Sequence, residues 1–411
     1  MAAAVVGYTD VKMGGYSSIA CHHSFAEALT ARNSPIMSQN ENRRQHSIGD
    51  ELRAVERLWQ LRLPDTFAKL YRNYANPFVA PCEFISLHRI ARGAGRDYGM
   101  LPQYLPFGRA VGEGGLYGFY ITPETALGDW PVLYWDEDEM YLRPVASNFD
   151  AFLRHCVLVG RYETEAQCAG MHTDELQDGR RMELLNRVGL LEQTPDGPLP
   201  RNDSELYSQL VSMDAQDATS LCHLGCAQRS RNRDERALDF FHRASEASLW
   251  FGDPYYLVAD VYCARGNYAR AVEGWWSAIQ CLLPLCTRTW EWDLGADHPE
   301  ADIYEVAADG LAQFGDSSDS GHELDPLWQV ATRDDPYDPD VRETLGDTLL
   351  AQGNFLGAER EFLNALALCC GVPGKQPDRL YDDLIRIYER MGRQREAELA
   401  RHDRALPRPT G

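Results

Sequence analysis

The most constraining feature of this chain is a triplet of a small, a bulky and a small side chain that recurs along its carboxy-terminal half. The triplet occupies three sets of positions, with the second thirty-four residues after the first: Ala237, Phe241 and Ala244; Ala271, Trp275 and Ala278; and Ala358, Phe362 and Ala365. Spacings of four and three residues place each triplet on one stripe of a helix, where the small residues let a second helix approach closely. A period of this length is typical of stacked helical repeats. We therefore expect an array of paired helices.

Positions outside the triplets follow the same register. Tyr262, Gly266 and Tyr268 precede the second triplet, and Leu345 with Gly346 precedes the third. This pattern resembles the tetratricopeptide repeat (TPR). The resemblance predicts four units, at residues 218–251, 252–285, 339–372 and 378–411, within an all-α superhelix that covers residues 218–411.

The stretch between the second and third of these units has room for one irregular unit with an insertion. We predict its helices at residues 301–314 and 323–332, and a loop at residues 316–321 from the Asp, Ser and Gly content. Arg401 and Arg404 stand in the last unit where the pattern has apolar residues. A polar outer helix is expected of a repeat that caps an array. The array should thus contain about five units.

Residues 47–165 combine helical and strand patterns. Leu52, Val55 and Trp59 recur at helical spacing, and Pro64 can open a second helix. Four short runs rich in aromatic and branched residues follow, at residues 83–87, 116–121, 131–135 and 140–145, and they predict an antiparallel meander. Ser147 marks the start of a closing helix. The predicted class is α+β, with helices packed on an antiparallel sheet.

The order of these elements resembles the SMI1/KNR4 family, also called the SUKH superfamily. The resemblance rests on four motifs: Leu63-Pro64-Asp65, Leu105-Pro106-Phe107-Gly108, Pro131-Val132 leading to Trp135-Asp136, and Ser147-Asn148-Phe149. The segment at residues 89–104 is longer than the SMI1/KNR4 pattern has before its Leu-Pro-Phe-Gly strand, and we interpret it as a surface loop.

The resemblance implies a protein-binding module without catalytic activity. Bacterial members of the family resemble immunity proteins that neutralise toxins of polymorphic systems, and fungal members resemble cell-wall and signalling regulators. Together with TPR repeats, this implies a non-catalytic interaction protein. Two alternatives stay open: an immunity-type inhibitor of a toxin, or a regulatory scaffold that holds different partners on its two parts.

Two segments lie outside these domains. Residues 1–46 show no clear period, and we expect a disordered leader there. Residues 166–217 are expected to be a linker with short helices, because Pro195, Pro198 and Pro200 break regular structure. If this linker is flexible, the two domains should unfold independently.

Charge and cysteine content limit the choice of partner and compartment. The net charge is −22, which disfavours nucleic acid and anionic membranes and favours a basic protein partner. No apolar stretch is long enough to span a bilayer, and the first residues lack the charged start of a secretory signal. The 11 Cys are an odd number without paired spacing, as expected of reduced thiols. We expect a cytoplasmic protein.

The first candidate binding surface lies at the end of a predicted strand. Asp136, Glu137, Asp138 and Glu139 form an acidic run that can face a basic site on a partner, and Trp135 can anchor an interface. The alternative interpretation is a solvated turn after a core tryptophan.

The second candidate surface is the groove of the repeats, which in TPR proteins is lined by the first helix of each unit. The register places Tyr256 and Asp260 there in one unit, and Glu343 and Asp347 in another. These carboxylates should repel an acidic ligand, so we expect a basic or mixed peptide. An acidic but solvated face is an equal alternative.

Sequence patterns for enzyme chemistry are weak. Cys222, His223 and Cys226 lack a second pair at zinc spacing, and Cys21, His22 and His23 lie in the predicted leader. The glycines at positions 112, 114, 115 and 118 precede a strand where a phosphate-binding loop needs a helix, so a hairpin turn explains them better. We predict no catalytic residues, no metal and no cofactor.

Overall fold

The computed structural model describes residues 41–74, 77–91, 100–111, 114–122, 128–167, 175–190, 198–292, 301–315, 322–369 and 377–406. Most of the expected leader, with Cys21, His22 and His23, lies outside these residues. The first described element, helix α2 (Glu41–Leu58), begins inside the range predicted as leader.

The amino-terminal domain (residues 41–167) is built on one antiparallel sheet. Its six strands pair in chain order: β1 (Phe78–Val79), β2 (Cys82–Phe84), β3 (Tyr104–Ala110), β4 (Leu116–Tyr120), β5 (Val132–Trp135) and β6 (Leu142–Ala146). Phe119 of β4 lies opposite Leu105 of β3 on one side and Val132 of β5 on the other. The predicted meander is confirmed.

Helices close the sheet through a cluster of aromatic side chains. Helix α3 (Asp65–Asn73) contributes Phe67, and helix α5 (Phe149–Gln167) contributes Phe149. The Phe67 ring lies 5.1 Å from that of Phe149 and 5.4 Å from that of Phe119 on β4, in edge-to-face contacts that aromatic pairs favour. The expected α+β class is therefore confirmed for this domain.

Two local predictions in this domain were wrong. The strand expected at residues 83–87 ends at Phe84, and a short helix, α4 (Leu87–Ile90), follows it. The closing helix is capped by Asn148, whose side chain accepts a hydrogen bond from the Ala151 amide at 2.9 Å, and not by Ser147. Ser147 instead hydrogen-bonds with Asp214, 67 residues further along the chain.

The predicted linker contains two helices, α6 (Glu175–Val188) and α7 (Asp203–Met213). Asn202 caps α7 by accepting a hydrogen bond from the Glu205 amide at 3.0 Å. Helix α6 packs on α3 and α5, and α7 packs between α5 and the first helix of the repeats.

The helical array (residues 203–406) begins with α7 and continues with five helix pairs within the described residues. The pairs are α8 (Ala218–Arg229) with α9 (Asp234–Ala247), α10 (Asp253–Ala264) with α11 (Tyr268–Ile279), α12 (Ile303–Phe314) with α13 (Pro326–Arg333), α14 (Pro339–Ala351) with α15 (Phe355–Leu368), and α16 (Asp378–Arg390) with α17 (Gln394–Ala405). This confirms the predicted all-α array of paired helices.

Glycine–aromatic contacts explain the repeated triplet. A Cβ atom on Gly225 of α8 would lie 2.3 Å from the Phe241 ring of α9, and one on Gly346 of α14 would lie 2.6 Å from the Phe362 ring of α15. The two helices of a pair can pack this closely only without that atom. In four of the five pairs the turn between the helices has a residue with a left-handed backbone conformation, at Asn232, Gly266, Gly353 or Gly392, with φ of 71° at Gly266.

The third pair is the irregular one. Two 3-10 helices, η2 (Leu283–Leu285) and η3 (Thr289–Trp292), lie between α11 and α12. A third, η5 (His322–Leu324), precedes α13. Helix α12 still stacks in register, because Gly310 lies against the Trp275 ring of the second triplet.

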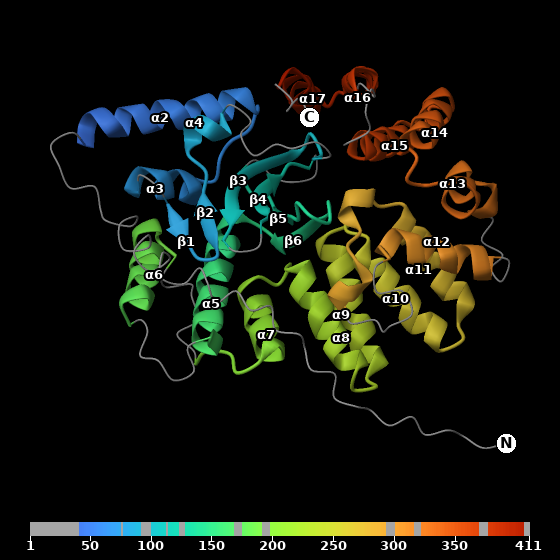
Figure 1. Ribbon diagram of the computed structural model, residues 1–411, viewed down its shortest axis with the longest axis horizontal. Coiled ribbons are helices and arrows are strands. Elements are labelled where there is room, and N and C mark those ends of the chain that lie inside the picture. Colours follow the sequence, from blue (N-terminus) through green and yellow to red (C-terminus); the bar gives the residue numbers. More distant parts are fainter. Residues whose placement is uncertain are drawn as a thin grey trace.

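The array curves around one side of the amino-terminal domain. Figure 1 shows α7 and α8 below the sheet, α10 to α13 to its side, and α16 and α17 above it. The first and last helices of the array therefore both lie next to the same small domain.

Candidate protein-binding site

Polar contacts between the array and the amino-terminal domain include three groups, and the first lies at the edge strand β6. The Asp214 carboxylate, just after α7, accepts hydrogen bonds from the Ser147 amide at 2.7 Å and from its hydroxyl at 2.8 Å. The Thr219 hydroxyl on α8 donates to the Pro144 carbonyl at 2.6 Å. These bonds fix the start of the array on the sheet.

The second contact joins the insertion of the array to the β5–β6 hairpin. Glu291 accepts hydrogen bonds from the Tyr141 hydroxyl and from the Arg143 guanidinium, the latter at 2.9 Å. Arg288 pairs with Glu139 at 2.9 Å. Because only 8% of the Glu291 side chain is exposed, this carboxylate is a partly desolvated link between the two parts.

The third contact comes from the last helix pair. The Gln103 amide donates to the Tyr388 hydroxyl at 2.7 Å, and Arg395 donates to the Thr122 carbonyl at 3.1 Å while stacking 5.0 Å from the Trp130 ring. Both ends of the array therefore hold the same domain. Independent unfolding was expected only if the linker is flexible, and contacts at both ends of the array do not favour that condition.

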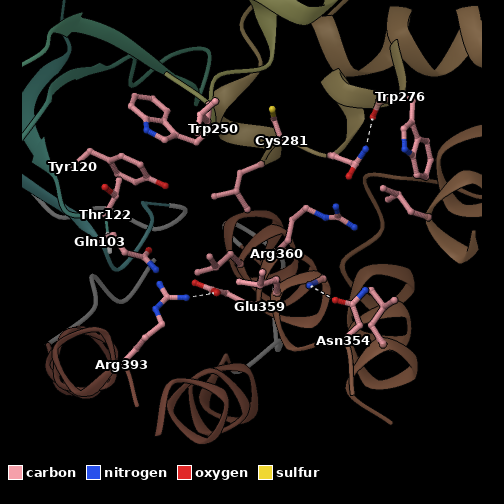
Figure 2. A pocket seen from close by; sticks show the side chains of 18 of the residues that line it. Gln103, Tyr120, Thr122, Trp250, Trp276, Cys281, Asn354, Glu359, Arg360 and Arg393 are labelled. Carbon is pink, nitrogen blue, oxygen red and sulfur yellow. Dashed lines mark hydrogen bonds and ion pairs between the residues drawn. The ribbon is translucent and has the colours of Figure 1, made fainter. Parts of the chain in front are cut away.

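A cleft of about 400 Å³ lies where the two parts meet. Figure 2 shows Gln103, Tyr120 and Thr122 of the amino-terminal domain on one side, with Trp250 of the array beside Tyr120, and Trp276 on the opposite side. The floor is formed by α15 and the start of α17, with these side chains: Asn354, Glu359, Arg360 and Arg393. Clefts of this size at domain boundaries are the usual place for a ligand.

The charged side chains in the cleft are held by one another. Glu359 pairs with Arg393 at 2.5 Å, and Arg360 donates to Glu361 at 2.6 Å. Burial raises the pKa of Glu359, and the adjacent Arg393 offsets part of that rise. Tyr388 also hydrogen-bonds Glu359, so a polar chain runs from Gln103 of the small domain to Arg393 of the array.

A second, smaller cavity of about 220 Å³ lies beside the β5–β6 hairpin. Trp135, Glu139 and Met140 of the hairpin line it together with Arg288 and Tyr337 of the array. This cavity, too, is formed by both parts of the chain.

The predicted acidic run is the turn of the β5–β6 hairpin. Asp136 accepts hydrogen bonds from the amides of Asp138 and Glu139, at 3.0 and 2.9 Å. Glu137 and Asp138 are exposed, whereas Glu139 pairs with the array. Trp135 is 2% exposed and belongs to the core at the hairpin's base. Its predicted role as an interface anchor stays a prediction.

The three predicted groove carboxylates lie in ion pairs between neighbouring repeats. Asp260 pairs with Arg229 of the preceding helix pair. Glu343 and Asp347 both pair with Arg379 on α16, each at 2.6 Å. Tyr256 is partly buried, and none of these four predicted groove residues lines the 400 Å³ cleft. The basic peptide expected there stays a prediction.

Cys222, His223 and Cys226, the residues considered as metal ligands, lie on α8, where His223 packs against aromatic rings. The His223 ring stacks on Tyr207 at 4.1 Å and lies tilted against the Trp292 ring at 4.9 Å, and burial lowers the pKa of His223 to about 3. No cluster of three or more potential metal ligands occurs in the part of the chain that the structure describes.

Sequence reasoning missed the cleft residues. Leu249 and Trp250 follow the first triplet directly, and Leu356 stands in the first turn of α15. Each is a large apolar residue close to a helix end, which is the signal that was available. Gln103 had no such signal in the sequence, because 285 residues separate it from its hydrogen-bond partner Tyr388.

Comparison with known proteins supports the description of the amino-terminal domain. Residues 49–155 match the model of the SMI1 / KNR4 family (SUKH-1). The chain therefore carries an SMI1/KNR4 domain, followed by a TPR-like array of paired helices. A comparison with curated proteins gives no match.

Three solved structures are similar to parts of the chain. YrrB, "a TPR protein with an unusual peptide-binding site", is 18% identical over 49% of this chain and 93% of its own, with a TM-score of 0.22. The APC/C hetero-tetramer Cut9-Hcn1 is 17% identical, with coverages of 62% and 44% and a TM-score of 0.23. MamA is 12% identical, with coverages of 56% and 94% and a TM-score of 0.18.

No helix in the described part of the chain is a candidate for crossing a membrane. Among the helices in the described ranges, none combines the length and the apolar content that a bilayer crossing requires.

Proposed function

We propose that this chain is a non-catalytic protein-binding protein whose SMI1/KNR4 domain and repeats act as one body on one partner. The observation that carries the proposal is the interface itself. Contacts at Asp214, Glu291 and Tyr388 hold the small domain at both ends of the array, and the larger cleft has walls from both parts. A surface assembled in this way suits one partner that touches both parts.

Within this class, the immunity-type inhibitor fits best. An inhibitor must present a preformed surface to one protein, and preorganisation lowers the entropic cost of binding. A scaffold with separate partners on its two parts would gain more from domains that move independently. The family to which residues 49–155 belong is consistent with either role.

Affinity capture with the full chain as bait tests the proposal. The expected result is one protein held in a one-to-one complex, whose toxicity to a host cell is relieved when the chain is co-expressed. Simultaneous binding of two different proteins would favour the scaffold instead. Turnover of a captured small molecule by the chain would contradict a non-catalytic role.

The exposed end of the acidic hairpin turn is proposed as an electrostatic guide for a basic partner. Replacing Glu137 and Asp138 with Lys should slow association with that partner about tenfold at low salt, and less at high salt, because the effect is screened. The matched control replaces Asp239 and Asp309, exposed on α9 and α12, with Lys, which gives the same change of net charge. An equal slowing in the control would show that the overall net charge, and not the hairpin turn, causes the effect.

A further inference from the structure

Two leucines at the larger cleft are exposed to an unusual degree. Leu249, between α9 and α10, is 69% exposed, and Leu356 at the start of α15 is 66% exposed, and both line the cleft. Covering such a side chain is worth roughly 1.5–3 kcal/mol. The cleft therefore offers apolar surface that a bound group would remove from water.

The aromatic walls of the cleft are fixed by their own contacts. Tyr120 packs edge-on against Trp250 with ring centroids 4.9 Å apart, and Trp276 stacks on His322 at 4.6 Å. Rings held in this way form a rigid surface, which lowers the cost of ordering the site on binding.

The charges of the cleft favour an uncharged occupant. Its four charged lining residues are already engaged: Glu359 with Arg393, Arg360 with Glu361, and Asp325 as the cap of α13 through the Leu327 amide at 2.8 Å. A charged ligand group entering here would lose its water without gaining a partner.

Two buried polar atoms of lining residues, Gln103 Oε1 and Arg393 Nε, lack a hydrogen-bond partner, and the first is an acceptor. Gln103 is 5% exposed, and its Nε2 donates to Tyr388, but its Oε1 is buried and has no hydrogen-bond donor within reach. Leaving a buried acceptor unpaired costs about 1–3 kcal/mol. A donor brought into the cleft would relieve this cost.

We propose that the cleft binds an extended, uncharged segment of the partner protein. A bulky apolar side chain of that segment packs against Leu249 and Leu356, and a backbone N–H donates to Gln103 Oε1. This inference rests on the proposed function and adds to it the chemistry of what is recognised, which differs from the basic peptide expected in the repeat groove.

Selection of short random peptides displayed on phage, with the full chain as target, tests the inference. The selected peptides should share a Leu, Met or Phe and show no enrichment in Lys, Arg, Asp or Glu. Leu249→Asp and Leu356→Asp should each weaken their binding at least about tenfold, which corresponds to roughly 1.4 kcal/mol. The matched control is Leu324→Asp, because Leu324 is 87% exposed and does not line the cleft.

Three outcomes would overturn the inference: peptides enriched in basic residues, peptides that bind the two variants as well as the control, or no selected peptide at all. Far-ultraviolet circular dichroism confirms that each variant is folded. A natural partner that still binds both variants would leave the proposed function intact while removing the cleft from it. Peptides that bind as expected, with no protein captured by the full chain, would instead remove the proposed function.

Discussion

Replacing Glu361 with Gln is expected to lower the free energy of unfolding by about 3 kcal/mol, because it leaves a buried cation without its counterion. Glu361 and Arg342 are 0% exposed and lie 2.8 Å apart, and Arg342 also lies over the Tyr304 ring of α12. The pair therefore joins three helices of the array at a place that water does not reach. Chemical denaturation followed by circular dichroism measures the loss.

The effect should depend on pH in a defined direction. Burial alone would raise the pKa of Glu361, but Arg360 and Arg342 outweigh it and hold the pKa below its ordinary value. A lowered folded pKa means that the stabilisation is present above the pKa of an unfolded glutamate and is lost as pH falls through the folded pKa. The difference between the wild type and Glu361→Gln should thus be largest near neutral pH and shrink in acid.

The matched control for this substitution is Glu389→Gln. Glu389 pairs with Arg401, but their side chains are 50% and 35% exposed, and such surface pairs contribute less than about 1 kcal/mol. If Glu361→Gln costs no more than Glu389→Gln at neutral pH, the buried pair does not hold the array together as described.

The second large effect is expected at the contact between the two parts. Replacing Glu291 with Gln should cost about 2 kcal/mol, because charge-assisted hydrogen bonds to Tyr141 and Arg143 are weakened in a largely buried place. Amide hydrogen exchange should then accelerate both in the β5–β6 hairpin and in η3, since each loses its support from the other.

Glu246→Gln on α9 serves as its control, because Glu246 is exposed and is not a partner of Tyr141 or Arg143. A change of exchange confined to η3, with the hairpin unaffected, would show that the two parts do not stabilise each other through Glu291.

Much of the fold could be predicted because it repeats or alternates. Ala237, Ala271 and Ala358 occupy one register position in three helix pairs, and all are completely buried. Strands β4 to β6 are rich in aromatic and branched residues, so the composition of these short runs predicted their positions in the sequence. Strand β1 has only two residues and helix α4 only four, and elements this short show neither a repeat nor an alternation of apolar residues.

The cleft could not be predicted, for a different physical reason. Its walls meet only after the array has curved back onto the sheet, and contacts such as Gln103 with Tyr388 or Arg395 with the Thr122 carbonyl have no local pattern. The predicted acidic residues were chosen for charge. Asp260, Glu343 and Asp347 already have arginine partners in neighbouring repeats, which a single sequence does not reveal.

The central claim is that the SMI1/KNR4 domain and the repeats form one body around a shared cleft, and differential scanning calorimetry of the full chain tests it most directly. One transition, with equal calorimetric and van't Hoff enthalpies, is predicted because the array holds the domain at both ends. Two separate transitions, unchanged by Glu291→Gln, would show two independent domains and contradict the account.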